Sequence, residues 1–230
     1  MTKRIVALVP MKAHSERVKN KNFRNFCGKP LFRWIVDTLL AVEEIDQIVI
    51  NTDARKLLKE DGLVESERIL IRDRKPELCG DLVSMNLILA DDIANVDADL
   101  YIMSHVTNPL LSKETIQQAI DKLGKAMNNS QADSLFTVNK IQTRFYQQDG
   151  TPVNHDPDNL IRTQDLEPWY EENSNLYIFT KESFQSTNAR IGKFPIMHEC
   201  KHLESVDIDE EEDWQLASAI ANQIHGESNH

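Results

Sequence analysis

A short polar segment near the start of the chain concentrates positive charge around one hydroxyl. Its cations are Lys12, Arg17, Lys19 and Lys21, and they surround Ser15. The segment follows an apolar run that is typical of a buried strand, and open α/β sheets bind their ligands at the carboxyl ends of strands. Several cations in such a loop call for a polyanion, of which a nucleoside triphosphate is the obvious example.

Two carboxylates near the other end of the chain have a spacing that suits a hard cation. Asp207 and Asp209 belong to a tract that we expect to end a strand. Side chains two residues apart on a strand project to the same face, so both could reach one Mg²⁺ ion through oxygen. Without a cation, like charges packed this closely are costly. The alternative is an acidic first turn of the following helix, where carboxylates are favourable on their own.

The elements that must position these segments alternate between strand and helix. Apolar runs predict strands over Ile5–Val9, Gln47–Asn51, Arg68–Ile71 and Leu100–Ser104. Helical spacing of apolar residues predicts helices over Leu31–Leu39, Ser84–Ala94 and Thr115–Met127, the last with Ser112 as its N-cap. This order indicates βαβ units and a mainly parallel sheet flanked by helices.

The alternation is interrupted at about residues 140–172, which contain prolines, Asp and Asn but no helical pattern. We expect an irregular or hairpin excursion here. Its aromatic residues would form an interface or a wall of the substrate site, or would pack back on their own domain. The strand pattern returns at Asn175–Thr180 and Leu203–Val206, and a final helix is expected over Glu210–Gln223.

Length, charge and cysteine content restrict the class of protein. With 230 residues, of which 40% are hydrophobic, the chain suits one α/β domain. The formal net charge of −11 argues against a nucleic-acid-binding protein, whose surface is basic overall. The three cysteines show no zinc or disulfide spacing. Since neither a signal peptide nor an apolar run of about 20 residues is recognisable, we expect a cytoplasmic protein with no membrane contact.

The first part of the chain also resembles a known signature. Lys12-x-x-Ser15, Lys21-Asn22 and Gly28-Lys-Pro-Leu31 match, without a gap, the N-terminal tract of the CMP-sialic acid synthetase (acylneuraminate cytidylyltransferase) family. That family usually has Arg at the position of Lys12. The resemblance implies that Lys12 and Lys21 hold the triphosphate and the leaving pyrophosphate, with Ser15 and Asn22 forming hydrogen bonds nearby.

Two further tracts resemble parts of the family's nucleotide site. Asp207-Ile-Asp209 is similar to the tract that binds the divalent ion, which makes Asp209 the first choice as a direct ligand and Asp207 the second. The segment that contains Arg74 and Lys75 resembles the family's segment that closes on the nucleotide. Its cation is either Arg74, which we favour, or Lys75. Ser84 then contacts the cytidine or the ribose, or else it caps the next helix.

The sugar-binding tracts match more loosely. His105 stands where the family has a Gln that faces the sugar, so it contacts the acceptor or only fills the end of a strand. Thr107 matches the family's threonine. Arg162 is the candidate for binding the carboxylate of the sugar acid. Asn173 matches an asparagine of the family's pattern.

The resemblance covers about residues 4–222 and implies a Rossmann-like nucleotidyltransferase fold over a single domain, 1–230. The inserted region at about 140–172 would then serve dimerisation or form a substrate wall. The implied activity is transfer of CMP from CTP, with Mg²⁺, to the anomeric hydroxyl of a sialic-acid-like (nonulosonic) 2-keto-3-deoxy sugar acid, with release of pyrophosphate. The alternatives are a CMP-Kdo-type or other sugar nucleotidyltransferase, or a non-catalytic nucleotide-binding module. We expect a homodimer and no nucleic-acid partner.

Overall fold

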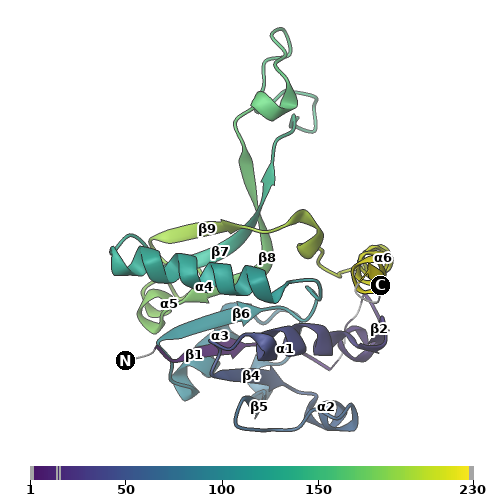
Figure 1. The fold of residues 1–230 in the computed structure, drawn as a ribbon, viewed down its shortest axis with the longest axis vertical. Coiled ribbons are helices and arrows are strands. Elements are labelled where there is room, and N and C mark those ends of the chain that lie inside the picture. The colour runs from purple at the N-terminus through teal and green to yellow at the C-terminus, as the bar shows by residue number, and fades with distance from the viewer. Residues whose placement is uncertain (1–2, 14, 16, 228–230) are drawn as a thin grey trace.

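A seven-stranded sheet forms the centre of the molecule (Figure 1). The structure is a computed structural model, and it describes residues 3–13, 15 and 17–227. The order of the strands in the sheet is β5-β4-β1-β6-β8-β7-β9. These strands are β1 (Ile5–Leu8), β4 (Gln47–Thr52), β5 (Ile69–Asp73), β6 (Leu100–Ser104), β7 (Ser134–Ile141), β8 (Trp169–Phe179) and β9 (Pro195–Glu199). A separate small ribbon pairs β2 (Asn25–Phe26) with β3 (Lys29–Pro30).

Parallel pairing dominates the sheet, as the alternation of patterns predicts. β1 pairs in parallel with β4 and β6, β4 with β5, and β7 with β9, whereas β8 runs antiparallel to its neighbours β6 and β7. The chain builds outward from β1 to β4 and β5, and then crosses to β6 on the other side of β1. The carboxyl ends of β1 and β6 therefore form a topological switch point, where open sheets bind ligands.

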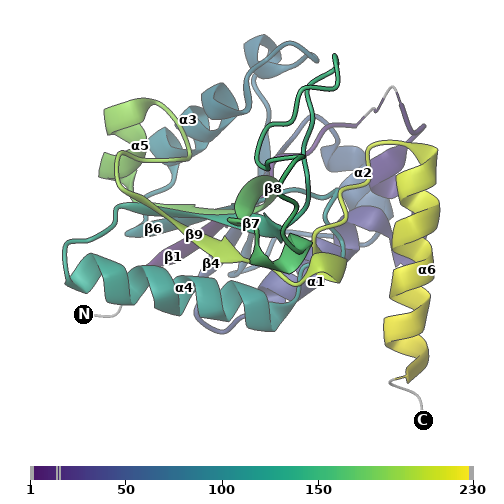
Figure 2. The same cartoon turned by 90° about the horizontal axis from the view of Figure 1, so that it is seen from above.

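Helices cover both faces of the sheet (Figure 2). Side chains of β1 and of Val9, which follows it, alternate between two cores. Ile5, Ala7 and Val9 pack in one core with α1, α4 and α6, while Val6 and Leu8 pack in the other with α3 and α5. A strand buried on both faces needs apolar residues at every position, which explains the continuous apolar run. The helices are α1 (Leu31–Ala41), α2 (Arg55–Glu60), α3 (Met85–Asn95), α4 (Lys113–Asn128), α5 (Lys181–Thr187) and α6 (Glu211–Glu227).

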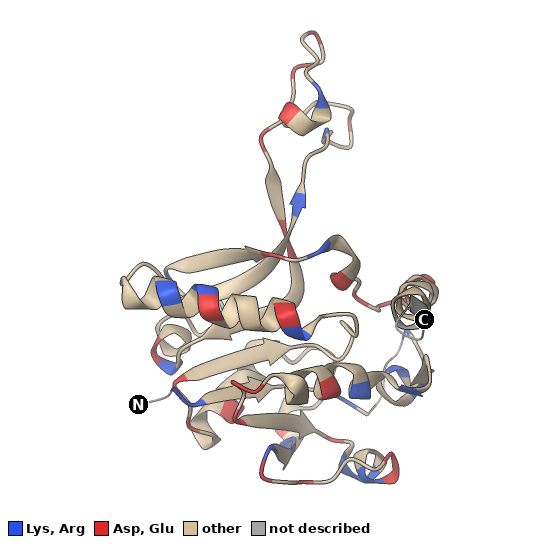
Figure 3. Ribbon diagram, viewed as in Figure 1, with Lys and Arg blue, Asp and Glu red and all other residues tan. Residues whose placement is uncertain are grey.

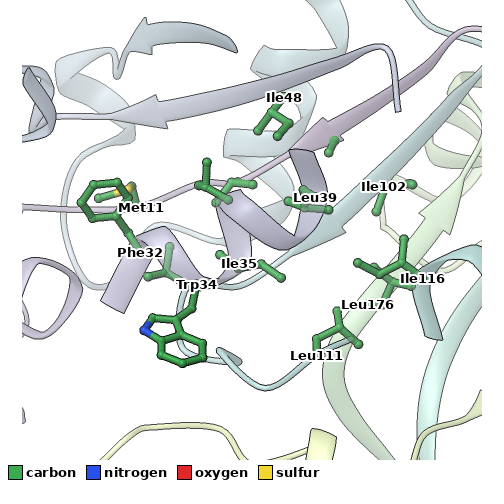
Figure 4. Close-up of a cluster of buried hydrophobic side chains, with 14 of the residues drawn as sticks. Met11, Phe32, Trp34, Ile35, Leu39, Ile48, Ile102, Leu111, Ile116 and Leu176 are labelled. Atoms are coloured by element: carbon green, nitrogen blue, oxygen red, sulfur yellow. The ribbon is translucent and has the colours of Figure 1, made fainter. Parts of the chain in front are cut away.

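The first core is built largely on α1. Figure 4 shows Ile35 and Leu39 of this helix beside Ile48 of β4 and Ile102 of β6, all of them with no exposed surface. Burying an aliphatic side chain of this size contributes about 1.5–3 kcal/mol, so this layer is a main support of the strands that end at the switch point.

The elements predicted in the first 130 residues agree with the structure. β6 has the expected bounds, and the other predicted strands and helices differ from the structure by one or two residues at an end. The expected N-cap of α4 is confirmed, because the Ser112 hydroxyl accepts a hydrogen bond from the Thr115 amide at 3.2 Å. The final helix begins at Glu211 and ends at Glu227, which is later at both ends than predicted.

The strand predicted over Leu203–Val206 is wrong. A 3-10 helix, η4 (His202–Glu204), and a loop occupy this region. The buried Glu204 carboxylate accepts hydrogen bonds from the Ser112 hydroxyl at 3.0 Å and the Thr115 hydroxyl at 2.6 Å. The segment therefore turns inward to bind the start of α4 and does not join the sheet.

Residues 142–168 form an arm that projects from the sheet at the ends of β7 and β8 (Figure 1). The two strands stay paired from Ser134 and Phe179 to Ile141 and Trp169, with one register shift between Phe136 and Val138. The arm thus confirms the predicted excursion, although β8 begins earlier than expected. Tyr146 on the arm is 55% exposed. The role of this region in dimerisation stays a prediction.

Charge is mixed over the outer elements of the molecule. Figure 3 shows acidic and basic residues interspersed along α4 and over the arm. Among the described residues, no helix combines the length and the hydropathy needed to cross a membrane.

Candidate functional site

A cavity of about 630 Å³ lies at the carboxyl ends of β1 and β6. The loop that follows β1 lines one part of it, and the residues after β6 line another. Further lining residues come from the loop before α6 and from the segment after α5. The predicted site residues that line the cavity are Lys12, Ser15, Lys21, Asn22, Arg74, His105, Thr107, Asp207 and Asp209. The fold therefore brings the two charged segments of the sequence into one site.

Hydrogen bonds fix the loop after β1 to itself and to the neighbouring strand. The Asn22 side-chain amide donates to the carbonyl of Lys12 at 2.8 Å and so closes the loop. The Ala13 amide donates to the Asp53 carboxylate, just beyond β4, at 2.7 Å. Asn22 is thus a structural residue of the loop as well as a lining residue of the cavity.

The two lysines predicted to hold phosphates already have partners. The Lys12 ammonium forms an ion pair with Asp81. Lys21 is 7% exposed, and its ammonium donates to the Ile208 carbonyl at 2.6 Å and lies 3.3 Å from the Asp209 carboxylate. Lys21 therefore ties the basic loop to the acidic tract within the cavity.

Asp207 and Asp209 lie in the loop between η4 and α6, not at the end of a strand as predicted. Both nevertheless line the cavity. The Ile208 amide between them donates to the Thr107 carbonyl at 2.9 Å, which fixes the tract beside the end of β6. Asp213 caps α6 by accepting from the Asp209 amide at 3.0 Å. Loop contacts and a helix cap therefore hold this tract at the cavity.

The two carboxylates differ in their surroundings. One oxygen of Asp207, Oδ1, is buried with no hydrogen-bond partner among the described residues. Burial raises the pKa of Asp207, and a hydrogen bond from Thr107 opposes the increase. The Oδ1 oxygen of Asp209, by contrast, lies 2.9 Å from the Arg17 guanidinium and 3.3 Å from Lys21.

This pair of carboxylates fits a Mg²⁺ ion. No group of three or more His, Cys, Asp and Glu side chains forms a metal site in the part of the chain that the structure describes. Mg²⁺ commonly uses only one or two protein carboxylates and completes its shell with water and substrate phosphates. The unpartnered Asp207 oxygen is the type of donor that such an ion needs.

Arg74 and Lys75 have different positions. Arg74 lines the cavity, and its guanidinium donates to the Asn51 carbonyl at 2.7 Å and the Met11 carbonyl at 3.0 Å. Its burial lowers the pKa of Arg74. The Lys75 ammonium lies 2.7 Å from Asp91 and does not line the cavity. Between the two alternatives, the structure therefore places Arg74 at the site.

Ser84 caps α3, because its hydroxyl accepts from the Asn86 amide at 3.3 Å. It lines a smaller adjoining pocket of about 290 Å³ and not the main cavity. The alternative that we gave for this serine, a helix cap, is therefore what the structure shows.

His105 and Thr107 line the cavity at the end of β6. Burial lowers the pKa of His105 to about 4, and the nearby positive charge of Arg190 adds to this effect. The imidazole is therefore neutral at physiological pH, and can donate one hydrogen bond and accept another.

Arg162 and Asn173 are not brought to the cavity wall, in contrast to our expectation. Arg162 lies on the arm, where its guanidinium donates to Asp165 at 2.7 Å. Asn173 is buried, and its side chain accepts from the Thr137 hydroxyl at 2.7 Å and donates to Asn139 at 3.0 Å. These bonds join β7 to β8, so Asn173 supports the wall from behind.

The cavity residues that were not among the predicted site residues include Arg17, Ser174 and Arg190. The basic loop contained the signal for Arg17. No local pattern marks Ser174 or Arg190, because only the pairing of β8 with β6 and the return of the chain after α5 bring them to the site.

The model of the family described as "Cytidylyltransferase" matches residues 6–225. The chain belongs to the cytidylyltransferase family. Its fold is shared with the solved structure of CMP:2-keto-3-deoxy-manno-octonic acid synthetase complexed with CTP, at a TM-score of 0.66 and 13% identity over 96% of this chain and 99% of that one. The predicted nucleotidyltransferase fold is thus confirmed.

Curated members of this cytidylyltransferase family match at modest identity. The N-acylneuraminate cytidylyltransferase of Oncorhynchus mykiss is 25% identical over 93% of this chain and 49% of its own length. The CMP-N,N'-diacetyllegionaminic acid synthase of Legionella pneumophila is 26% identical over 94% of this chain and 96% of its own length. The chain spans about half the length, or less, of several of the curated relatives it matches.

Proposed function

We propose that this cytidylyltransferase transfers CMP from CTP to the anomeric hydroxyl of a nonulosonic (sialic-acid-like) sugar acid and releases pyrophosphate. One observation carries the proposal. A buried lysine of the basic loop, Lys21, contacts the acidic tract of Asp207 and Asp209 inside one cavity at the switch point of the sheet. A site with clustered cations beside a pair of carboxylates suits a triphosphate and its divalent ion.

The basic loop supplies the charge for the phosphates. Lys12 and Lys21 would stabilise the negative charge that develops on the leaving pyrophosphate, because preorganised cations in a partly buried site act strongly on such charge. Ser15 and Asn22 also line the cavity. The Ser15 hydroxyl would form a hydrogen bond to the nucleotide, while Asn22 holds the loop through the Lys12 carbonyl and would use its remaining amide hydrogen. Arg74 holds the first residues of the loop through the Met11 carbonyl.

Asp207 and Asp209 are the residues that would hold Mg²⁺. When bound, the ion supplies neutralisation of phosphate charge and polarisation of the attacking hydroxyl. Asp209 would then interact both with the ion and with cations of the basic loop, because its carboxylate also faces Lys21 and Arg17. Those two cations would turn from Asp209 toward the phosphates when the nucleotide enters.

His105 and Thr107 lie where the acceptor would approach. The neutral imidazole of His105 is suited to hydrogen bonding with a sugar hydroxyl. Thr107 lines the cavity with Asp207, and its side chain favours the charged form of that carboxylate. Catalysis in this site would come mainly from positioning and electrostatics.

The arm is the proposed contact between two copies of the chain. Its support is the exposure of large apolar side chains on the arm and at the adjoining end of β8: Tyr146, Leu160, Trp169 and Tyr170 are 42% to 61% exposed. Sedimentation of the intact protein and of a variant with Tyr146 and Leu160 changed to Ser would test this contact. We expect a dimer that dissociates in the variant. A cytoplasmic location likewise stays a prediction.

The direct test is pyrophosphate release with CTP, Mg²⁺ and a panel of sugar acids. The panel comprises N-acetylneuraminic, pseudaminic, N,N'-diacetyllegionaminic and 2-keto-3-deoxy-manno-octonic acids, with ATP, GTP and UTP as control nucleotides. We expect release that depends on CTP and on one of the nonulosonic acids. Turnover with the octonic acid alone would favour a CMP-Kdo-type enzyme. CTP binding without release would favour a non-catalytic binding module, and failure to bind CTP would contradict the proposal.

A further inference from the structure

Arg190 is a cation of the cavity that belongs neither to the basic loop nor to the acidic tract, and the proposed function gives it no role. It lies between α5 and β9, and it lines both the main cavity and the smaller adjoining pocket. His105 lines the main cavity as well, and the charges of Arg190 and Lys21 both contribute to its lowered pKa. Arg190 and His105 belong to elements other than the loop that carries Lys12 and Lys21.

The guanidinium of Arg190 is held in place without using its hydrogen-bond donors. It lies over the ring of Tyr177, 4.1 Å from the centroid. The Glu172 carboxylate approaches it to 3.7 Å, which is beyond hydrogen-bond distance, and that carboxylate accepts instead from the Tyr177 hydroxyl. Among the described residues, no group accepts a hydrogen bond from Arg190, although its side chain is only 23% exposed.

The backbone beside Arg190 is also fixed. Gly192 donates its amide proton to the Ser134 hydroxyl at 2.9 Å, and the Asp133 carboxylate accepts from the Lys193 amide at 2.9 Å. A Cβ at Gly192 would collide with the side chains of Ser183 and Asp133. Close packing at a glycine therefore anchors the segment from which Arg190 reaches the cavity.

A planar guanidinium, stacked on an aromatic ring and with its donors free, matches a carboxylate better than a point charge does. We propose that Arg190 binds the carboxylate of the acceptor sugar acid and thereby selects acidic acceptors. The inference rests on the proposed function, which places the triphosphate at the basic loop and leaves the region of His105 and Arg190 for the acceptor. Arg190 takes the role that we had predicted for Arg162, whose guanidinium is engaged by Asp165 on the arm.

The test changes both partners of the proposed contact. Wild-type protein, Arg190→Met and Arg190→Lys are compared in pyrophosphate release, with the most active acid of the panel and with its methyl ester. Arg162→Met, the same substitution on the arm, is the matched control, and thermal melting checks the fold of each variant. Binding of CTP, and of the acid and ester to the CTP-loaded protein, is measured in parallel by titration calorimetry.

In the wild type, we expect the ester to be about 10²-fold poorer than the acid in kcat/KM, as for loss of a charged hydrogen-bonded pair. Arg190→Met should raise the KM for the acid by about the same factor and abolish the preference over the ester, with CTP binding unchanged. Arg190→Lys should retain part of the preference, because it keeps the charge but loses the fork. Arg162→Met should behave as wild type.

Three results would overturn the inference: an acid preference that persists in Arg190→Met, a loss of preference in Arg162→Met alone, or wild-type protein that binds none of the acids. The proposed function fails separately, if wild-type protein turns over no acid of the panel. In that case, the tightest-binding acid of the panel and its methyl ester are compared, and their binding to wild-type protein and Arg190→Met still decides the role of Arg190.

Discussion

The two sides of the cavity satisfy their charges differently. On the side of the basic loop, Lys12 is paired with Asp81, and Arg17 and Lys21 share Asp209. On the other side, Arg190 is stacked and fixed but forms no hydrogen bond to a described residue. The first side must therefore exchange protein partners for ligand atoms, whereas the second receives a ligand without breaking a hydrogen bond, although Glu172 lies 3.7 Å from Arg190.

The largest effect should come from removing a carboxylate on which the first side depends. We expect Asp207→Asn and Asp209→Asn each to lower kcat by about 10²–10³-fold, because each removes an anionic oxygen of the Mg²⁺ site. Pyrophosphate release at saturating CTP and acceptor measures the loss. The control is Glu212→Gln, an exposed acidic residue in the first turn of α6. Wild-type rates in both aspartate variants would remove the metal assignment.

The next effect concerns the lysine that joins the basic loop to the acidic tract. Lys21→Met should lower kcat/KM for CTP by about 10²-fold, because a buried cation beside the phosphates is lost. It should also lower the melting temperature, since the Ile208 carbonyl and Asp209 lose their donor. Lys19→Met, an exposed lysine of the same loop, is the control. Equal losses in the two variants would mean that overall loop charge matters, and not the position of Lys21.

A smaller effect should reveal the neutral histidine on the acceptor side. The pKa of His105 falls from 6.5 to about 4 in the folded protein, so the unfolded chain binds more protons between these values. Stability is therefore lost as pH falls through this window, by up to about 3 kcal/mol. His105→Gln should remove this part of the pH dependence. Denaturant unfolding at pH 7, 5 and 4, without Mg²⁺ or nucleotide, measures it, and an unchanged difference between pH 7 and 4 would contradict the assignment.

The smallest effect tests the exchange of partners directly. The Arg17–Asp209 pair is 59% and 45% exposed, so it contributes at most about 1 kcal/mol. Arg17→Gln should raise Mg²⁺ affinity by up to about fivefold, because the guanidinium no longer competes for Asp209, and it should weaken CTP binding by a similar factor. Calorimetric titrations at low and high salt would show both changes shrinking as salt screens the charges. A variant that gains affinity for both ligands would contradict the exchange.

Sequence reasoning succeeded where a local pattern was enough to determine structure. The strands that lead into the site are continuous apolar runs, and Ser112 precedes α4 as a typical N-cap. The basic loop was found because its charges are adjacent in the chain. For Asp207 and Asp209 the residues were identified but their setting was wrong, since the turn at Glu204 depends on a contact with α4 that no local pattern contains.

The acceptor side could not be read from the sequence in the same way. Arg190 and His105 are far apart in the chain, and the return of β8 between β6 and β7 brings them together. Arg162 was chosen because it is an arginine near the predicted sugar tract, but the arm carries it away from the cavity. Exposure and unused donors, which distinguish Arg190 from Arg162, are properties of the folded chain alone.

A single strand, β8, extends from the arm to the cavity. Trp169 and Tyr170 lie at its outer end, while Ser174 lines the cavity and Tyr177 packs under Arg190. A partner at the arm and an acceptor in the cavity would thus act on one continuous segment. Thermodynamic linkage makes any such influence mutual: whatever factor association adds to acceptor affinity, the acceptor returns to the association constant.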